Sequence, residues 1–429
     1  MQSVVLDEPY EFVPPYHGRI WPWFLQKLVL RRLRRCDGIE ELHFEGIERL
    51  QESIAAGHSV LLAPNHCRPS DPLIVSELCR RAGVAPYSMA SWHLFKQSRF
   101  QSFMLRRIGA FSVYREGLDR QALQAGIEIL QQAKRPLVIF PEGVITRTND
   151  RLLALMEGVS FVARSAAKKR AAANPPGQVV VHAVSIRYRF HGDIDAALHQ
   201  TLDAIEHRLS WRPKRDPDLV MRIYRVGEAL LWLKEIEYFG EPQTGEYPGR
   251  LRNLIDRILL PMEQEWLSGR TEDTTVARVK QLRIAILRDM VAGEVSEEER
   301  ARRWDQLADM YLAQQLGHYP TDYIRSNPTP ERMLETVEKF EEDLTDQCTI
   351  HRPMSATVRV GTAIPVSPKR IRGTAEDPLM SEVERQLHEM LEIPVPQANA
   401  PVDAPVAGDA RQSKTEPASD APGQPTLRQ

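Results

Sequence analysis

Short apolar runs alternate with amphipathic segments between His58 and Phe190. This alternation predicts an α/β fold, in which buried strands form a sheet and the connecting helices cover its faces. The clearest helix is predicted over Arg120–Gln132, where the apolar positions share one face and Asp119 can cap the first turn. The predicted strands are Ser59–Ala63, Ala85–Ala90, Ala110–Tyr114, Pro136–Phe140 and Val179–Tyr188.

Helical periodicity replaces the strand signals over residues 192–350. Apolar residues recur at helical spacing in Leu251–Leu259, and Ser296 is followed three positions later by a glutamate, as in a capping box. Thr329 precedes a proline, which is a typical start of a further helix. We therefore predict an all-helical insertion.

Strand character returns in Ala356–Val366 and is followed by one more amphipathic helix. The last segment is rich in Pro, Ala, Asp, Gln and Ser and is predicted to be a disordered tail. The predicted fold class is thus an α/β sheet flanked by helices, with a large all-helical insertion and a disordered C-terminal tail. We predict an N-terminal segment (1–37), a first sheet part (38–191), the insertion (192–350), a closing strand and helix (351–392) and the tail (393–429).

Composition limits the function. The 429 residues are 42% hydrophobic and carry a net charge of -2, so nothing favours a nucleic-acid partner, which needs a basic domain. The four cysteines lack the paired spacing of a zinc site and are expected to be free thiols in a reducing cytoplasm. No apolar stretch is long enough to span a membrane, and the N-terminus lacks the pattern of a signal peptide. We expect a cytoplasmic chain.

The stretch LLAPNHCRPSDPLIV ends an apolar run in His66, with Asp71 five positions later. Ligands of open α/β sheets bind just outside the carboxyl ends of strands, so a histidine here lies at a reactive edge. Asp71 precedes a proline that can start a helix, and its carboxylate can accept a hydrogen bond from one imidazole nitrogen. The other nitrogen is then free to act as a general base near neutral pH. The alternative is that both residues only cap a helix and a turn.

Two later stretches carry arginines at predicted strand ends. GAFSVYR places Phe111 and Arg115 on one face of a strand, and FPEGVITR ends a strand with Glu142 and a glycine before Arg147. Glycine allows close approach of the backbone to a ligand, and two arginines can hold a phosphate through paired hydrogen bonds.

Together, the three stretches resemble the conserved blocks of the glycerolipid acyltransferase family, typified by 1-acyl-sn-glycerol-3-phosphate acyltransferases. The blocks are matched in order by Asn65, His66 and Asp71, by Gly109, Phe111 and Arg115, and by Phe140, Pro141, Glu142, Gly143, Thr146 and Arg147. The resemblance covers roughly residues 38–190 and resumes at the strand VRVGTAIPV.

The resemblance implies an enzyme that moves a fatty acyl group from acyl-CoA or acyl carrier protein to the free hydroxyl of 1-acyl-sn-glycerol 3-phosphate. The product is phosphatidic acid, an intermediate of phospholipid biosynthesis. His66 would deprotonate the hydroxyl and Asp71 would orient His66, while backbone amides at Glu142 and Gly143 would stabilise part of the oxyanion. No metal or bound cofactor is implied.

Substrate contacts are also implied, with Arg115 and Arg147 holding the phosphate of the acceptor. The implied substrate-binding residues are Gly109, Phe111, Arg115, Glu142, Gly143, Thr146 and Arg147. The acceptor could instead be glycerol 3-phosphate, a lysophospholipid or an amine-bearing lipid. A different class is a non-catalytic membrane scaffold whose helical insertion recruits a partner.

The chain departs from the family pattern at three places. Ala183 stands where the fourth block usually has proline, which leaves the donor preference open, and Arg68 stands where many members have serine, which leaves the acceptor pocket open. The insertion of about 160 residues is the third departure. We interpret it as a stabilising or dimerising cap in preference to an acceptor-selecting lid.

The segment Gly18–Cys36 combines tryptophans and aliphatic residues with six basic residues and contains no acidic residue. Tryptophans beside a cationic helix are typical of an anchor that lies on the membrane surface. Peripheral association with the inner face of the membrane is therefore one hypothesis. The other is a first helix that packs on the sheet and exposes a basic face to solvent.

Overall fold

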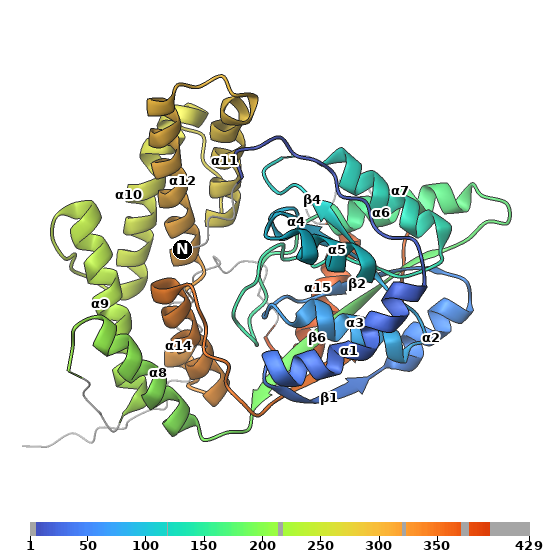
Figure 1. Ribbon diagram of the computed structural model, residues 1–429, viewed down its shortest axis with the longest axis horizontal. Helices are drawn as coiled ribbons and strands as arrows, with labels where there is room; N and C mark the ends of the chain where they lie inside the picture. The colour runs from blue at the N-terminus through green and yellow to red at the C-terminus, as the bar shows by residue number, and fades with distance from the viewer. Residues whose placement is uncertain (1–5, 118, 213–217, 320–322, 370–376, 395–429) are drawn as a thin grey trace, which may run out of the picture. The chain divides into compact units, whose positions relative to one another are not determined.

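The computed structural model describes residues 6–117, 119–212, 218–319, 323–369 and 377–394. Its strands are β1 (Ile39–Glu45), β2 (Ser59–Pro64), β3 (Tyr87–Ser91), β4 (Ala110–Val113), β5 (Leu137–Val138), β6 (Val179–Phe190), β7 (Met354–Val360) and β8 (Ile364–Pro365). Within the described residues these eight strands form one sheet in the order β1-β7-β6-β2-β5-β3-β4, and β8 pairs with β6 (Figure 1).

Helices cover both faces of the sheet. They are α1 (Ile20–Cys36), α2 (Ile47–Ala55), α3 (Asp71–Arg81), α4 (His93–Lys96), α5 (Arg99–Ile108), α6 (Arg120–Gln132), α7 (Gly158–Ala171) and α15 (Pro378–Leu391). In β2, Leu62 packs into the core shared with α1 and α3, and Leu61 packs into the core shared with α6, α7 and α15. A strand buried on both faces is apolar at consecutive positions, which is why this run could be recognised in the sequence.

Strand direction brings the functional loops to one edge. Strands β2 to β6 run parallel to one another, whereas β7 is antiparallel to β6 and β1 is parallel to β7. The loops that follow β2, β4 and β5 therefore meet at the carboxyl edge of the parallel strands. The chain that leaves β6 at this edge must also re-enter β7 there, so the intervening insertion lies at the same edge.

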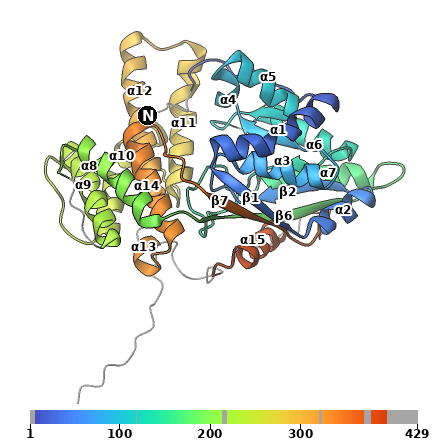
Figure 2. The ribbon, with the colours of Figure 1, turned by 60° about the horizontal axis from the view of Figure 1, so that its bottom comes forward.

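The insertion consists of helices within the described residues. They are α8 (Ile194–Arg208), α9 (Leu219–Phe239), α10 (Tyr247–Leu267), α11 (Thr275–Ala292), α12 (Glu297–Gly317), α13 (Tyr323–Ser326) and α14 (Pro330–Thr345). Helices α10, α11 and α12 enclose a core of their own, which includes Leu254, Leu282 and Met310. Helices α8 and α14 instead contribute Leu202 and Val337 to the core of the sheet. Figure 2 shows α8 and α14 beside each other.

The predicted fold class is confirmed for the sheet, its covering helices and the helical insertion. The predicted cap Asp119 accepts a hydrogen bond from the amide of Ala122 at 2.9 Å, and Ser296 and Thr329 cap α12 and α14. Strand β5 is shorter than predicted. The predicted disordered tail lies outside the described residues except for 393 and 394.

Strand β1 was not predicted, because its sequence IEELHFE alternates charged and apolar residues without a long apolar run. It lies at the edge of the sheet and pairs only with β7 among the described strands, so several of its side chains face solvent. No helix in the described part of the chain combines the length and the apolar character that crossing a membrane requires.

Candidate active site

His66 and Asp71 lie together at the carboxyl edge of the sheet. His66 follows the end of β2, and Asp71 is the first residue of α3. The two side chains meet with His66 Nδ1 2.9 Å from Asp71 Oδ2. The Asp71 side chain is fully buried, whereas 14% of the His66 side chain is exposed. The predicted dyad is therefore assembled, with its histidine on the accessible side.

The surroundings of Asp71 fix the tautomer of His66. The carboxylate accepts hydrogen bonds from the Arg68 amide at 2.9 Å and from the Tyr188 hydroxyl. Burial, reinforced by Asp71, raises the pKa of Tyr188, so its hydroxyl keeps the proton that it donates. Because an ionised carboxylate only accepts, Nδ1 of His66 must carry hydrogen and Nε2 keeps a free lone pair.

Two asparagines hold the loops of the site against β6, which extends beyond the end of β2. Asn65 accepts from the amide of Ile186 at 2.7 Å and donates to its carbonyl at 3.0 Å. Asn149 makes the same pair of bonds to Tyr188, at 2.6 Å and 2.7 Å. Their side chains thus substitute for a missing strand partner and fix the loops after β2 and β5.

Glu142 and Thr146 support the histidine loop. The two oxygens of Glu142 accept from the backbone amides of His66 at 2.7 Å and Leu153 at 2.9 Å. Burial raises the pKa of Glu142 to about 8, although these two bonds favour the ionised form. The amide of Thr146 donates to the His66 carbonyl at 2.9 Å. Glu142, through its side chain, and Thr146, through its backbone amide, therefore position the loop that carries the histidine.

Four other residues of the blocks, two aromatic residues and two glycines, have supporting positions. The ring of Phe140 stacks on His66 with centroids 4.1 Å apart. Gly143 has a φ of +69°, and its amide donates to the Phe140 carbonyl in a tight turn at 3.2 Å. Gly109 has a φ of +102° at the end of α5, and Phe111 is fully buried in the core. The structure gives Gly109 and Phe111 supporting positions, and their predicted substrate contacts remain predictions.

The two predicted phosphate-binding arginines differ in their partners. Arg147 forms an ion pair with Glu342 of α14 at 2.7 Å and has a φ of +57°, which is uncommon outside glycine. Arg115 follows β4 and forms no ion pair with any described residue. Burial lowers its pKa, against a smaller opposing effect of Glu116. Of these two arginines, Arg115 is therefore the one without an ion-pair partner among the described residues.

An acidic stripe on α14 was missed by the sequence analysis. It consists of Glu331, Glu335, Glu338 and Glu342, which contact the Phe190 amide, the Asn149 amide, Arg68 and Arg147, respectively. The spacing of these residues, i, i+4, i+7 and i+11, places them on one helical face and is the signal that could have revealed them. The insertion is thus bound to the loops that carry the site.

The stripe gives a prediction about pH. Burial raises the pKa of Glu335 to about 8 from an ordinary value of 4.5, although Arg68 opposes this shift. A carboxyl with a higher pKa in the folded chain binds its proton more tightly there, so the free energy of unfolding falls as pH rises between these values. In the variant Glu335→Gln, the free energy of unfolding should therefore fall less with rising pH than it does in the parent protein. The difference should be up to about 1.4 kcal/mol per pH unit.

Urea unfolding of both proteins at about pH 5.5 and about pH 7.5 measures this difference. Glu331→Gln is the matched control on the same helix, and it should keep the pH dependence of the parent. Equal slopes for Glu335→Gln and the parent would contradict the prediction.

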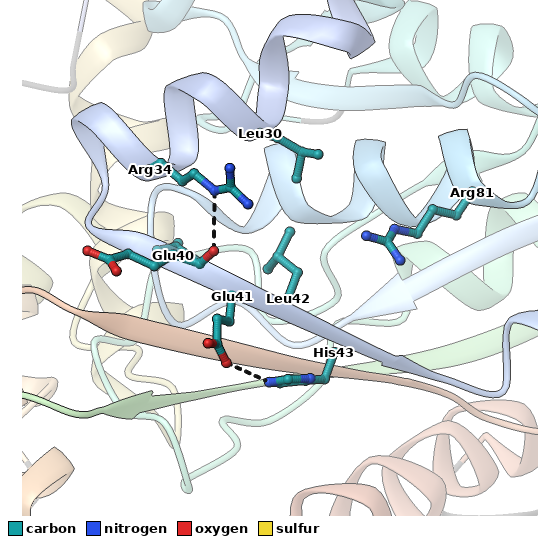
Figure 3. A pocket seen from close by; sticks show the side chains of 8 residues that line it. Leu30, Arg34, Glu40, Glu41, Leu42, His43 and Arg81 are labelled. Carbon is teal, nitrogen blue, oxygen red and sulfur yellow. Dashed lines mark hydrogen bonds and ion pairs between the residues drawn. The ribbon is translucent and has the colours of Figure 1, made fainter.

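A separate pocket lies away from these residues. Its volume is about 250 Å³, and it opens between α1, α3 and β1 (Figure 3). Its lining includes Leu30, Arg34 and the ion pair of His43 with Glu41 at 3.4 Å. None of its lining residues belongs to the three blocks, so this pocket lies apart from the candidate site.

Comparison with known proteins agrees with this geometry. Residues 41–187 match the family model described as Acyltransferase, and this range contains all three blocks. No curated protein matches the chain. Residues 41–187, which contain the histidine, aspartate and arginine blocks, are thus similar to the acyltransferase family, which includes the glycerolipid acyltransferases.

Proposed function

We propose that the protein transfers a fatty acyl group from a thioester donor, acyl-CoA or acyl carrier protein, to the free hydroxyl of 1-acyl-sn-glycerol 3-phosphate. The product would be phosphatidic acid, which places the enzyme in phospholipid biosynthesis. The observation that carries the proposal is the bond between His66 Nδ1 and Asp71 at 2.9 Å, because it leaves Nε2 as a base at the accessible side of the site.

The proposed reaction needs one base and one oxyanion site. Nε2 of His66 takes the proton of the acceptor hydroxyl, whose oxygen attacks the thioester carbonyl. The tetrahedral intermediate then collapses, the carbon–sulfur bond breaks, and the thiolate leaves with the proton that His66 returns. The amide of Gly143 is already committed to the Phe140 carbonyl, so Glu142 supplies the stronger candidate of the two amides for the oxyanion.

The acceptor phosphate would bind at Arg115, whose guanidinium has no competing carboxylate within ion-pair distance among the described residues. Arg147 contributes only if the phosphate displaces Glu342, whose side chain is 39% exposed. The two arginines therefore differ in the cost of binding, since an exposed ion pair is weak but still has to be broken.

Helices α1 and α5 provide the proposed contact with the membrane. The inner face of α1, with the buried residues Leu25, Val29 and Leu33, packs against α3, α5 and β1. Its outer face exposes Trp23 and Phe24, at 62% and 49%. The inner face is that of a packed first helix, and the proposed membrane contact concerns the exposed outer face.

The outer face of α1 continues onto the neighbouring helix α5. There Phe100 is 72% exposed, and the ring of Phe103 meets Trp21 edge-on at 5.6 Å. The last turns of α1 add the exposed arginines at positions 31, 32, 34 and 35, of which Arg34 also donates to the Glu40 carbonyl at 3.3 Å. We name this apolar and basic region, formed by the outer face of α1 and by α5, the interfacial surface, and propose that it binds the cytoplasmic face of an anionic membrane.

Initial rates of thiol release across a panel of acceptors test the proposed substrate. The panel contains lysophosphatidate, glycerol 3-phosphate, a neutral lysophospholipid and an amine-bearing lipid, each with acyl-CoA and with acyl carrier protein as donor. We expect the highest kcat/KM with lysophosphatidate. A higher value for another acceptor would reassign the substrate, and no transfer to any acceptor would favour the scaffold.

A further inference from the structure

Buried arginines in the helical insertion are, as a rule, paired with carboxylates. Four of them illustrate this: Arg222 with Glu206 at 2.8 Å, Arg250 with Glu235 at 2.8 Å, Arg278 with Glu263 at 2.7 Å and Arg303 with Glu299 at 2.7 Å. Such pairing is required because an unpaired charge in the interior costs several kcal/mol. A buried arginine without a carboxylate therefore needs an explanation.

Arg283 of α11 is that exception. Only 8% of the residue is exposed, and its Nε and Nη2 are buried without a hydrogen-bond partner in the described part of the chain. Burial lowers the pKa of Arg283 to about 10. On the same helix, Arg278 has both Glu263 and Asp256 as partners. The guanidinium of Arg283 is thus desolvated and has hydrogen-bond donors that no described residue uses. An anion-binding residue requires such donors.

Charged groups of both signs influence Arg283. Beside the effect of burial, Glu116 raises the pKa of Arg283, Arg115 lowers it and Tyr311 raises it. Neither arginine forms an ion pair with Glu116 or with another described residue. Arg115, which follows β4, and Arg283, on α11, are therefore two neighbouring guanidinium groups that lack an ion pair in the described part of the chain.

Histidines complete this region around Arg115. Nε2 of His318 is buried without a hydrogen-bond partner among the described residues, and burial together with Lys339, Arg115 and Arg151 lowers the pKa of His318 to about 3. Burial and Arg115 lower the pKa of His93 to about 4, and its Nδ1 bonds Ser91. Lys339 is balanced by Asp343 at 3.5 Å. His318 is thus neutral and has a ring nitrogen to which no described residue bonds.

The N-terminal segment joins α11 to the loop after β4. The ring of Tyr10 stacks on Tyr114 at 5.2 Å, immediately before the arginine of that loop. Asp7 forms an ion pair with Arg300, which also donates to the Met290 carbonyl of α11 at 3.1 Å. In Figure 1 this segment, in dark blue, runs from α11 across to the strands near β4. The two cationic groups are therefore held by a continuous set of contacts.

We propose that Arg115, Arg283 and His318 form a binding site for a phosphate monoester, which we name the Arg283 site, and that its ligand is the phosphate of the acceptor. The choice of ligand rests on the proposed function. Two planar guanidinium groups can each bond two phosphate oxygens, and a dianion compensates both buried charges. The insertion then supplies part of the acceptor site instead of serving only as a stabilising cap.

Binding measured without turnover tests this site. Calorimetric titration of the full chain uses sn-glycerol 3-phosphate, which is the water-soluble head of the acceptor, and CoA, which carries the donor phosphates. Arg283→Gln should weaken glycerol 3-phosphate binding at least tenfold and leave CoA binding unchanged. Its melting temperature without ligand should not fall, because the removed charge has no protein partner.

Two further variants make the result specific. Arg288→Gln removes an exposed charge from the same helix and should bind both probes as the parent does. Arg283→Lys keeps the charge but loses the planar arrangement of guanidinium donors, so it should weaken glycerol 3-phosphate binding without a folding defect. Parental binding of glycerol 3-phosphate by both Arg283 variants would overturn the site.

The other outcomes also decide the assignment. A selective loss of CoA binding in Arg283→Gln would overturn the choice of ligand and assign the site to a donor phosphate. An equal loss in Arg288→Gln would overturn a specific role for Arg283. If the parent binds glycerol 3-phosphate through Arg283 but transfers no acyl group, the proposed function fails while the anion site stands.

Discussion

Replacement of His66 by alanine is expected to lower acyl-transfer turnover by about 10² to 10⁴-fold, the contribution of a positioned general base. The reason is that only the free Nε2 of this ring can take the proton of the acceptor hydroxyl in the proposed mechanism. The side chain is partly exposed and its main packing partner is Phe140, so the fold should survive. Steady-state rates with purified protein and thermal melts of the same sample measure both effects.

Variants of the supporting residues separate chemistry from folding. Asp71→Asn can donate to Nδ1 and so favours the wrong tautomer of His66, which should lower turnover nearly as much. Tyr188→Phe removes one of the donors to Asp71 and should have a smaller effect. Turnover near the parental rate in His66→Ala would exclude this histidine as the base.

Removal of the four arginines on the interfacial surface is expected to release the protein from anionic vesicles. Each basic residue near such a surface contributes about 1 kcal/mol, so the change Arg31, Arg32, Arg34 and Arg35→Gln should weaken partitioning by roughly 10³-fold at low salt. All four side chains are exposed, so the melting temperature should remain unchanged. Flotation with vesicles at low and high salt measures the effect.

A matched control removes the same charge from the opposite face of the sheet. Glutamine at the exposed positions Arg120, Lys134, Lys168 and Lys169 on and beside α6 and α7 should leave vesicle binding unchanged. Binding that is indifferent to salt and to the α1 arginines would contradict an electrostatic contact with the membrane.

Much of the sheet could be predicted from the sequence because its strands are buried on both faces. Consecutive apolar residues mark β2 and β6, and Asp119 marks the start of α6. The edge strand β1 was missed because solvent on one side permits charged residues such as Glu41. The antiparallel direction of β7 relative to β6 could not be predicted either, because no local sequence pattern indicates it. This direction determines at which edge of the sheet the insertion lies.

The dyad was predictable for a local reason, since Asp71 starts α3 and lies within reach of His66 five residues before it. The contacts between the insertion and the loops of the site could not be predicted. Arg68 and Glu338, for example, are 270 positions apart in the sequence. The sequence likewise could not show that Arg283 lacks a described partner, because nothing in the sequence distinguishes it from the four paired arginines of the insertion. Only the packing of the helices separates these two cases. Interpreting the insertion as a cap therefore followed from the absence of a local pattern.

Direct identification of the lipid product tests the central claim. The parent protein is incubated with acyl-CoA and 1-acyl-sn-glycerol 3-phosphate in anionic vesicles, and the lipids are analysed by mass spectrometry beside His66→Ala. We predict phosphatidic acid in stoichiometric amounts with free CoA from the parent protein, and a background amount from the variant. Equal amounts of phosphatidic acid from both proteins, or free CoA without any acylated lipid, would contradict acyl transfer by this site.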